Sequence, residues 1–213
     1  MALLITDPKL ESELIAERRR CDGDRFDEVW EGIYVMAPLP NDEHQDVQAN
    51  FVAAFKDFFG WDSLAKVRAG VNVSDRNEGW EQNYRCPDVV VFLPGTKAIN
   101  HGAHWEGGPD FLVEIASDRD RAREKLPFYA AVGVREVLIV DRNPWGLELY
   151  ASAGSPAAMK LVGTAGPDDG SELRSTVLPL VFQLHAAGLR PRINMARAEP
   201  AGAEAGARNS WLI

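Results

Sequence analysis

Residues 108–129 read "GPDFLVEIASDRDRAREKLPFY". Residues 111–115 form an apolar run that is typical of a buried strand, yet Glu114 lies within it. Glutamate is almost never fully buried without a partner, so this side chain either faces solvent on one side of the strand or belongs to a functional site. A run of alternating Asp and Arg residues follows, and Lys125 comes after it on a predicted helix.

Helical and strand patterns alternate on both sides of this stretch. Helices are predicted at 1–20, 41–60 and 118–133, a β-hairpin at 25–38, strands at 65–74, 84–95, 108–116, 134–144, 147–153 and 157–166, and a last short element at 176–188. This order predicts an α/β fold with a mixed central β-sheet flanked by helices, preceded by an N-terminal helix and a hairpin. The strand at 134–144 is expected to cross back into the sheet beside the strand at 108–116.

The length of 213 residues suits one main domain. We expect an N-terminal helical arm at 1–20, a single domain at 21–195 and a flexible C-terminal tail at 196–213, which is rich in Ala and Gly. The formal net charge of -9 excludes a protein that coats nucleic acid by bulk charge, although a local basic patch would still allow contact.

The sequence has no apolar run near the ~20 residues that a membrane helix needs. Its N-terminus lacks the pattern of a signal peptide. Cys21 and Cys86 stand alone, which argues against a disulfide framework or a structural zinc site. We therefore expect a cytoplasmic protein with free thiols.

Two acids lie in or beside predicted strands. Asp88 precedes the apolar run 89–93, and Glu114 lies inside the next strand. If these strands are neighbours, the two carboxylates converge and repel each other unless a cation is present, and oxygen ligands favour Mg²⁺ or Mn²⁺. Lys125 lies one to two helical turns into the next helix and could reach the same point. Asp110 follows Gly108 and Pro109, so we interpret it as a turn residue.

These residues carry a resemblance. "PDVVV" at 87–91, "VEI" around Glu114 and the lysine that follows are similar to the PD-(D/E)XK nuclease superfamily. Most of residues 24–150 resembles one branch of it, the Uma-two-type restriction endonuclease family. The matching segments are "EVWEGIYVMAP", "NDEHQ", "YRCPDVVVF", "PDFLVEIAS", "REKLPFYAAVGVREVLIVD" and "LELY". The resemblance implies a restriction-endonuclease-like core.

The resemblance also implies roles for single residues. Asp88 and Glu114 match the two metal-binding acids, and Lys125 matches the lysine of this branch. In the basic superfamily pattern the lysine comes two residues after the second acid, where this chain has Ala116, so the site depends on Lys125. Glu28 and His44 match two further polar positions of the branch.

The implied activity is that of a metal-dependent endonuclease. Asp88, Glu114 and the carbonyl of Ile115 would hold Mg²⁺, which Mn²⁺ can replace, and Lys125 would act on the attacking water. The substrate would be nucleic acid, with DNA expected, and a homodimer would cut two strands. The phosphate contacts would come from Arg119, Arg121 and Arg123.

Other interpretations remain open at this stage. The same arginines alternate with acids and could form a solvated helix face. The domain could be a catalytically degenerate relative that binds nucleic acid or a partner protein. His101 and His104 could bind a transition metal, but no third and fourth ligand is obvious. A serine hydrolase or a Walker-type phosphate loop is not supported, because neither motif is present.

Overall fold

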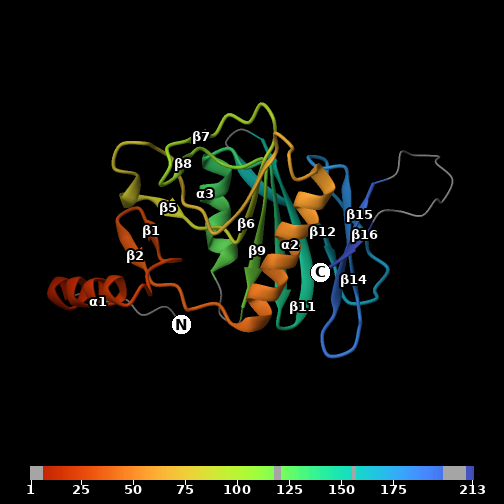
Figure 1. Cartoon of the computed structure of the whole chain (residues 1–213), viewed down its shortest axis with the longest axis horizontal. Helices are drawn as coiled ribbons and strands as arrows, with labels where there is room; N and C mark the ends of the chain where they lie inside the picture. Colours follow the sequence, from red (N-terminus) through yellow and green to blue (C-terminus); the bar gives the residue numbers. More distant parts are fainter. Residues whose placement is uncertain (1–6, 118–120, 155–156, 199–209) are drawn as a thin grey trace.

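The computed structural model describes residues 7–117, 121–154, 157–198 and 210–213 (Figure 1). This part of the chain contains three α-helices and two 3₁₀ turns, namely α1 Pro8–Arg20, α2 Asp42–Phe59, α3 Leu126–Ala131, η1 Trp80–Gln82 and η2 Ala122–Lys125. None of the helices in these ranges is long and apolar enough to cross a lipid bilayer.

A mixed six-stranded sheet forms the centre of the fold. Its order is β12-β11-β10-β9-β6-β3, with β3 Lys66–Ala69, β6 Val89–Phe92, β9 Phe111–Ala116, β10 Glu136–Arg142, β11 Trp145–Ala153 and β12 Ala158–Ala165. Strands β9 and β10 are parallel, and the other neighbours are antiparallel. Because η2 and α3 connect β9 to β10, the predicted helical crossover is confirmed, as is the mixed α/β class.

Helix α2 and a second sheet cover one face of the central sheet. The second sheet has the order β13-β14-β15-β16, with β13 Leu173–Arg174, β14 Leu180–His185, β15 Arg192–Arg197 and β16 Ser210–Leu212. Phe51 and Phe55 of α2 pack with Val113 of β9 and Phe182 of β14 in one core cluster. The predicted apolar stripe of α2 is therefore the surface that meets the sheet.

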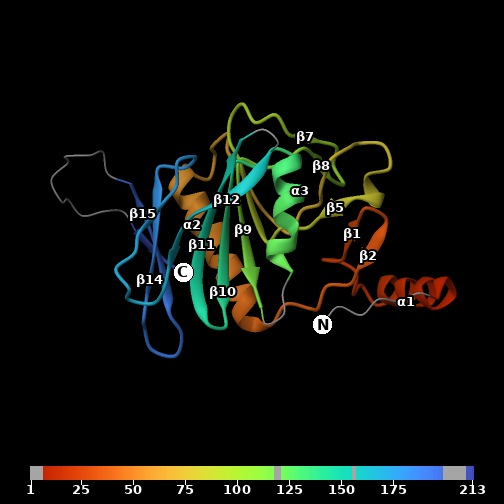
Figure 2. The ribbon, with the colours of Figure 1, turned by 180° about the vertical axis from the view of Figure 1, so that it is seen from behind.

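Helix α3 and a small sheet lie on the other face. The two views show this arrangement from opposite sides, with α2 in front of the central sheet in Figure 1 and behind it in Figure 2. The small sheet has the order β2-β1-β5-β4-β8-β7, with β1 Glu28–Trp30, β2 Ile33–Val35, β4 Val73–Ser74, β5 Tyr84–Arg85, β7 Ile99–Asn100 and β8 Trp105–Glu106. Trp105 stacks on Phe92 of β6 with ring centroids 3.7 Å apart.

The predicted N-terminal helix and hairpin are both present. The turn between β1 and β2 has Glu31 at φ 50° and Gly32 at φ 85°, a conformation that suits a tight hairpin. Helix α1 has no buried residue and projects from the body of the molecule (Figure 1). Its anchor is Arg18, whose Nε and Nη2 donate to the carboxylate of Asp27 at 2.5 and 2.6 Å.

Two expectations are wrong in part. The helix predicted at 118–133 is divided into η2 and α3, because Pro127 lacks the N–H that a continuous helix would use. Residues 118–120 lie outside the described ranges. The expected flexible tail is also incorrect for 210–213, since β16 pairs with β15 and Ile213 is buried.

Candidate active site

Asp88 and Glu114 lie on the same face of the central sheet. Strands β6 and β9 are antiparallel with Val89 opposite Val113, so the next pair in the register sets Asp88 opposite Glu114. The main-chain N–H of Ile115 donates to Oδ2 of Asp88 at 2.7 Å. The expectation that the two acids come from neighbouring strands is therefore met.

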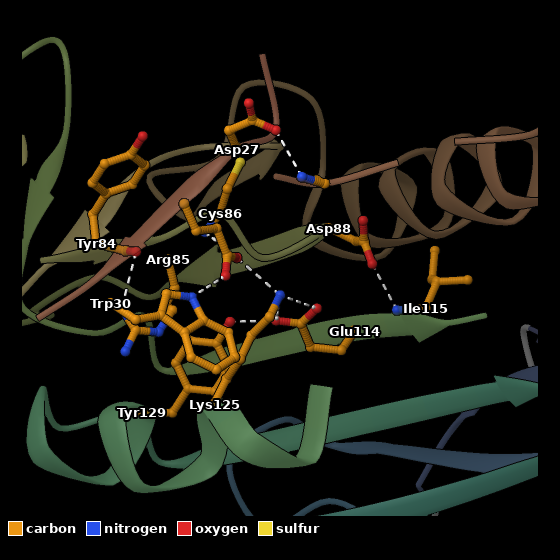
Figure 3. Close-up of polar contacts among 12 residues, drawn as sticks. Asp27, Trp30, Tyr84, Arg85, Cys86, Asp88, Glu114, Ile115, Lys125 and Tyr129 are labelled. Carbon is orange, nitrogen blue, oxygen red and sulfur yellow. Dashed lines mark hydrogen bonds and ion pairs between the residues drawn. The ribbon is translucent and has the colours of Figure 1, made fainter. Parts of the chain in front are cut away.

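Glu114 points toward α3 and is only 3% exposed. Its neighbours on this face, Leu112 and Ala116, are buried in the core cluster beneath α3. Nζ of Lys125 donates to both carboxylate oxygens of Glu114 at 3.2 Å, and the hydroxyl of Tyr129 donates to Oε1 (Figure 3). The alternative of a solvated strand face is excluded, and the predicted reach of Lys125 to the acid is confirmed.

Glu28 completes the surroundings of Lys125. Its Oε1 lies 2.9 Å from Nζ of Lys125 and also accepts the main-chain N–H of Cys86 at 2.8 Å. Its Oε2 accepts the indole N–H of Trp30 at 2.6 Å. One ammonium group is thus shared by two buried glutamates, one from β1 and one from β9.

Trp30 is itself held between two guanidinium groups. Arg121 lies 4.1 Å from the ring centroid of Trp30 and Arg85 lies 4.6 Å from it. Arg85 also lies 4.2 Å from the ring centroid of Phe128 in α3. These cation–π contacts connect the β1–β2 hairpin to the segment that carries Lys125.

The electrostatics of the cluster reflect burial and an excess of acids. Burial, together with the nearby charges of Asp88 and Glu28, raises the pKa of Glu114 to about 8, even though Lys125 acts in the opposite direction. Burial lowers the pKa of Lys125, but the carboxylates around it outweigh this effect and hold the pKa well above its ordinary value. Lys125 therefore stays charged. Burial raises the pKa of the Cys86 thiol, which disfavours the reactive thiolate.

His44 lies at the edge of this cluster, in the first turn of α2. Its Nε2 is 3.1 Å from Oδ1 of Asp88. Its Nδ1 is buried and has no hydrogen-bond partner within the described part of the chain. The predicted position of His44 beside the acids agrees with this geometry, while its role stays a prediction.

The donor chemistry fits a hard divalent cation. Asp88 and Glu114 supply carboxylate oxygens from facing strands, and proteins often bind Mg²⁺ through one or two carboxylates, with waters completing the shell. In the described ranges no group of three or more His, Cys, Asp or Glu side chains is arranged to hold a metal ion. Waters or substrate oxygens would therefore complete the coordination. Glu114 and Glu28 share a single lysine, and Asp88 adds a further negative charge nearby, so a divalent cation would balance the charge.

The arginines expected to contact nucleic acid form ion pairs within the chain. Arg121 pairs with Glu124 at 2.6 Å, and Arg123 pairs with Asp141 at 2.5 Å and Glu148 at 2.9 Å. Arg119 lies outside the described residues. Their expected phosphate contacts thus stay a prediction.

The loop histidines do not form a metal site in the described structure. His101 and His104 stack face to face with ring centroids 5.0 Å apart, and His101 pairs with Glu106 at 3.0 Å. His104 also stacks on Trp80 at 4.7 Å and is only 3% exposed. These contacts favour a packed aromatic layer over a chelating pair.

Sequence reasoning missed three members of the cluster. Tyr129 lies four residues after Lys125, a helical spacing that could have placed both side chains over Glu114. Trp30 lies two residues after Glu28 in a strand, which is the same-face spacing. The position of Arg85 depends on the pairing of β1 with β5, which no local pattern indicated.

Among solved structures, the structure is similar to the crystal structure of "a putative nuclease belonging to DUF820 from Anabaena variabilis ATCC 29413". The match has a TM-score of 0.50 and 15% identity, and it covers 63% of this chain and 75% of that chain. At this identity the likeness concerns the fold. No curated protein sequence matches the chain. The sequence pattern of the Uma2 family, described as "Putative restriction endonuclease", matches residues 16–187, and the chain therefore belongs to the Uma2 family.

Proposed function

We propose that this protein is an Mg²⁺-dependent endonuclease that hydrolyses phosphodiester bonds of DNA, and that Mn²⁺ can replace Mg²⁺. One observation carries the proposal: Asp88, Glu114 and Lys125 meet at one end of a mixed sheet. A buried ionic cluster of this kind is costly to desolvate and is weak support for stability alone. Strongly shifted pKa values at such a cluster are typical of functional sites.

Each residue of the cluster has a proposed task. Asp88, Glu114 and the carbonyl of Ile115 would hold the cation, which when bound supplies a water of lowered pKa and neutralises charge on the phosphate. Lys125 would orient the attacking water and stabilise negative charge on the phosphate oxygens. His44 would face the scissile phosphate from the side of Asp88.

The proposed substrate contact uses Arg121 and Arg123, with Arg119 as a further candidate. The side chains of Arg121 and Arg123 are 35% and 45% exposed, and a guanidinium has five N–H groups, so an ion pair leaves donors for a phosphate. A homodimer would place two such sites on the two strands of a duplex.

The test is cleavage of a supercoiled plasmid with Mg²⁺, with Mn²⁺ and with a chelator. Wild-type protein should nick the plasmid only with metal, and Asp88→Ala should not, because it removes a metal-binding carboxylate. Asp57→Ala is the matched control, since Asp57 lies on the exposed part of α2 and its carboxylate accepts the indole N–H of Trp211, away from the acidic cluster.

Equal cleavage by Asp88→Ala and wild type would point to a contaminating nuclease. If no variant cleaves under any condition, the alternative of a degenerate domain that binds nucleic acid or a partner protein is favoured. Whether the protein cleaves nucleic acid or only binds it, its affinity for DNA should fall steeply as the salt concentration rises, because contacts to phosphates weaken with salt.

A further inference from the structure

Every carboxylate oxygen of the two proposed metal-binding acids already contacts a group of the chain. On Asp88, Oδ1 lies 3.1 Å from Nε2 of His44, and Oδ2 accepts the N–H of Ile115. On Glu114, both oxygens contact the ammonium of Lys125, and Oε1 also accepts the hydroxyl of Tyr129. A cation that binds Glu114 must therefore compete with a positive charge that already occupies its oxygens.

Lys125 is placed between two possible acceptors. Its ammonium has three N–H donors, and its described contacts are one oxygen of Glu28 at 2.9 Å and two oxygens of Glu114 at 3.2 Å. The side chain of Lys125 is 12% exposed, so water offers little replacement if both acids are lost. A small displacement toward Glu28 would free Glu114 and still leave the lysine paired.

The carboxylate of Glu28 is held in a fixed position, so it would not move during such a displacement. Its carboxylate is fixed by the N–H groups of Cys86 and Trp30. The indole of Trp30 is in turn held between Arg85 and Arg121. Glu28 is therefore a rigid acceptor rather than a side chain free to swing toward the metal.

Tyr129 would hold the carboxylate of Glu114 in place while the lysine moves. It comes one helical turn after Lys125, is fully buried, and donates to Oε1 of Glu114. Once the lysine withdraws, this hydroxyl keeps the carboxylate oriented and supplies part of the hydrogen bonding that the lysine gave.

We propose that Lys125 is the internal counter-ion of this site, and that a divalent cation binds Glu114 as the ammonium withdraws onto Glu28. Glu28 and Tyr129 are then positioning residues for this exchange. The inference rests on the proposed function, because it assumes that Asp88 and Glu114 take a divalent cation. It goes further by making metal affinity depend on a residue that is not a metal ligand.

The experiment is calorimetric titration of the full-length protein with Mn²⁺ in the absence of DNA. It compares wild type, Glu28→Gln, Lys125→Met and the double variant, with circular dichroism to verify folding. Lys125→Met should bind Mn²⁺ about tenfold more tightly, because a like charge is removed from the ligand oxygens. Glu28→Gln should bind it about tenfold more weakly, because Lys125 then remains on Glu114.

The double variant distinguishes the two possible roles of Glu28. Without the lysine, replacing Glu28 should weaken Mn²⁺ binding by less than about threefold, which is only the effect of a nearby charge. If the loss is equally large in both backgrounds, Glu28 is a direct metal ligand and the inference is overturned. It is also overturned if Lys125→Met binds no more tightly than wild type.

A crystal structure of the wild type with Mn²⁺ tests the exchange without any substitution. The ammonium of Lys125 should then contact Glu28 and lie beyond hydrogen-bond distance of Glu114. Bound Mn²⁺ with Lys125 still on both oxygens of Glu114 refutes the exchange and leaves the proposed nuclease function intact. Absence of any Mn²⁺ binding by the wild type contradicts both the exchange and the metal-dependent function.

Discussion

Glu114 and Glu136 are buried glutamates on the neighbouring parallel strands β9 and β10, and only 3% and 1% of their surface is exposed. The carboxylate of Glu136 accepts the hydroxyl of Ser175, and the N–H and hydroxyl of Thr176 at 2.8 and 2.6 Å. All of these donors are neutral. The carboxylate of Glu114 instead faces the ammonium of Lys125, which it shares with another acid.

This difference separates an acid with a structural role from the acid that we propose to be functional. Glu136 is fully hydrogen-bonded by one short segment, so it fixes the connection between β13 and β14 onto β10. Glu114 shares the ammonium of Lys125 with Glu28, and Asp88 lies opposite Glu114 in the register, so the acids outnumber the lysine in this cluster. Burial alone therefore does not distinguish the two carboxylates, whereas the balance of charge around each of them does.

The largest expected effect is on cleavage. Glu114→Gln should reduce the rate of plasmid cleavage about 1000-fold or more, because an amide cannot replace the charge that binds the cation. Glu136→Gln is the matched change and should cleave within about threefold of wild type per folded molecule. The rates are measured under single-turnover conditions. If both variants lose activity to the same extent, the functional distinction between the two glutamates is wrong.

The next effect is on stability, and here the change at Glu136 should cost more than the change at Glu114. Glu136→Ala should lower the free energy of unfolding by about 3 kcal/mol, because it leaves several buried donors without an acceptor. Glu114→Ala should lower it less, by about 2 kcal/mol, because only the Tyr129 hydroxyl loses its acceptor outright, while Lys125 keeps its contact with Glu28 and a repulsion between acids is removed. Urea denaturation without metal measures both. A larger loss for Glu114→Ala would mean that Glu114 is the structural residue.

Much of the central fold could be predicted because its signals are local. The stripe of α2, the hairpin turn at Glu31 and Gly32, and the apolar runs of β6, β9 and β10 were visible in the sequence. The second sheet was not, because of its strands only β14 lies in a predicted element, at 176–188, whereas β13, β15 and β16 are defined by their pairing rather than by a pattern of their own. The docking of Ile213 depends on β15 in the same way.

The candidate site was predicted where the residue types are unusual for their positions. Asp88 and Glu114 contradict the apolar pattern of their strands, and this contradiction identified them. Tyr129 and Trp30 conform to the pattern of buried aromatic residues, so nothing in the sequence distinguished them from ordinary core side chains. Their importance comes from the polar atoms at their ends, which only the packing of α3 and β1 against β9 reveals.

The smallest expected effect concerns Tyr129, the neutral donor to Glu114. Tyr129→Phe keeps the ring and removes the hydroxyl, which in the wild type lowers the pKa of Glu114 against the upward effect of burial. The pKa of Glu114 should therefore rise further. Under the proposed function the ionised carboxylate binds the cation, so kcat/KM should increase as the pH passes through this pKa, and the rising limb should move to higher pH in the variant. Cleavage near neutral pH should fall about tenfold and recover as the pH is raised. A pH profile that falls uniformly, with no displacement of the limb, would mean that Tyr129 only fills space beneath α3.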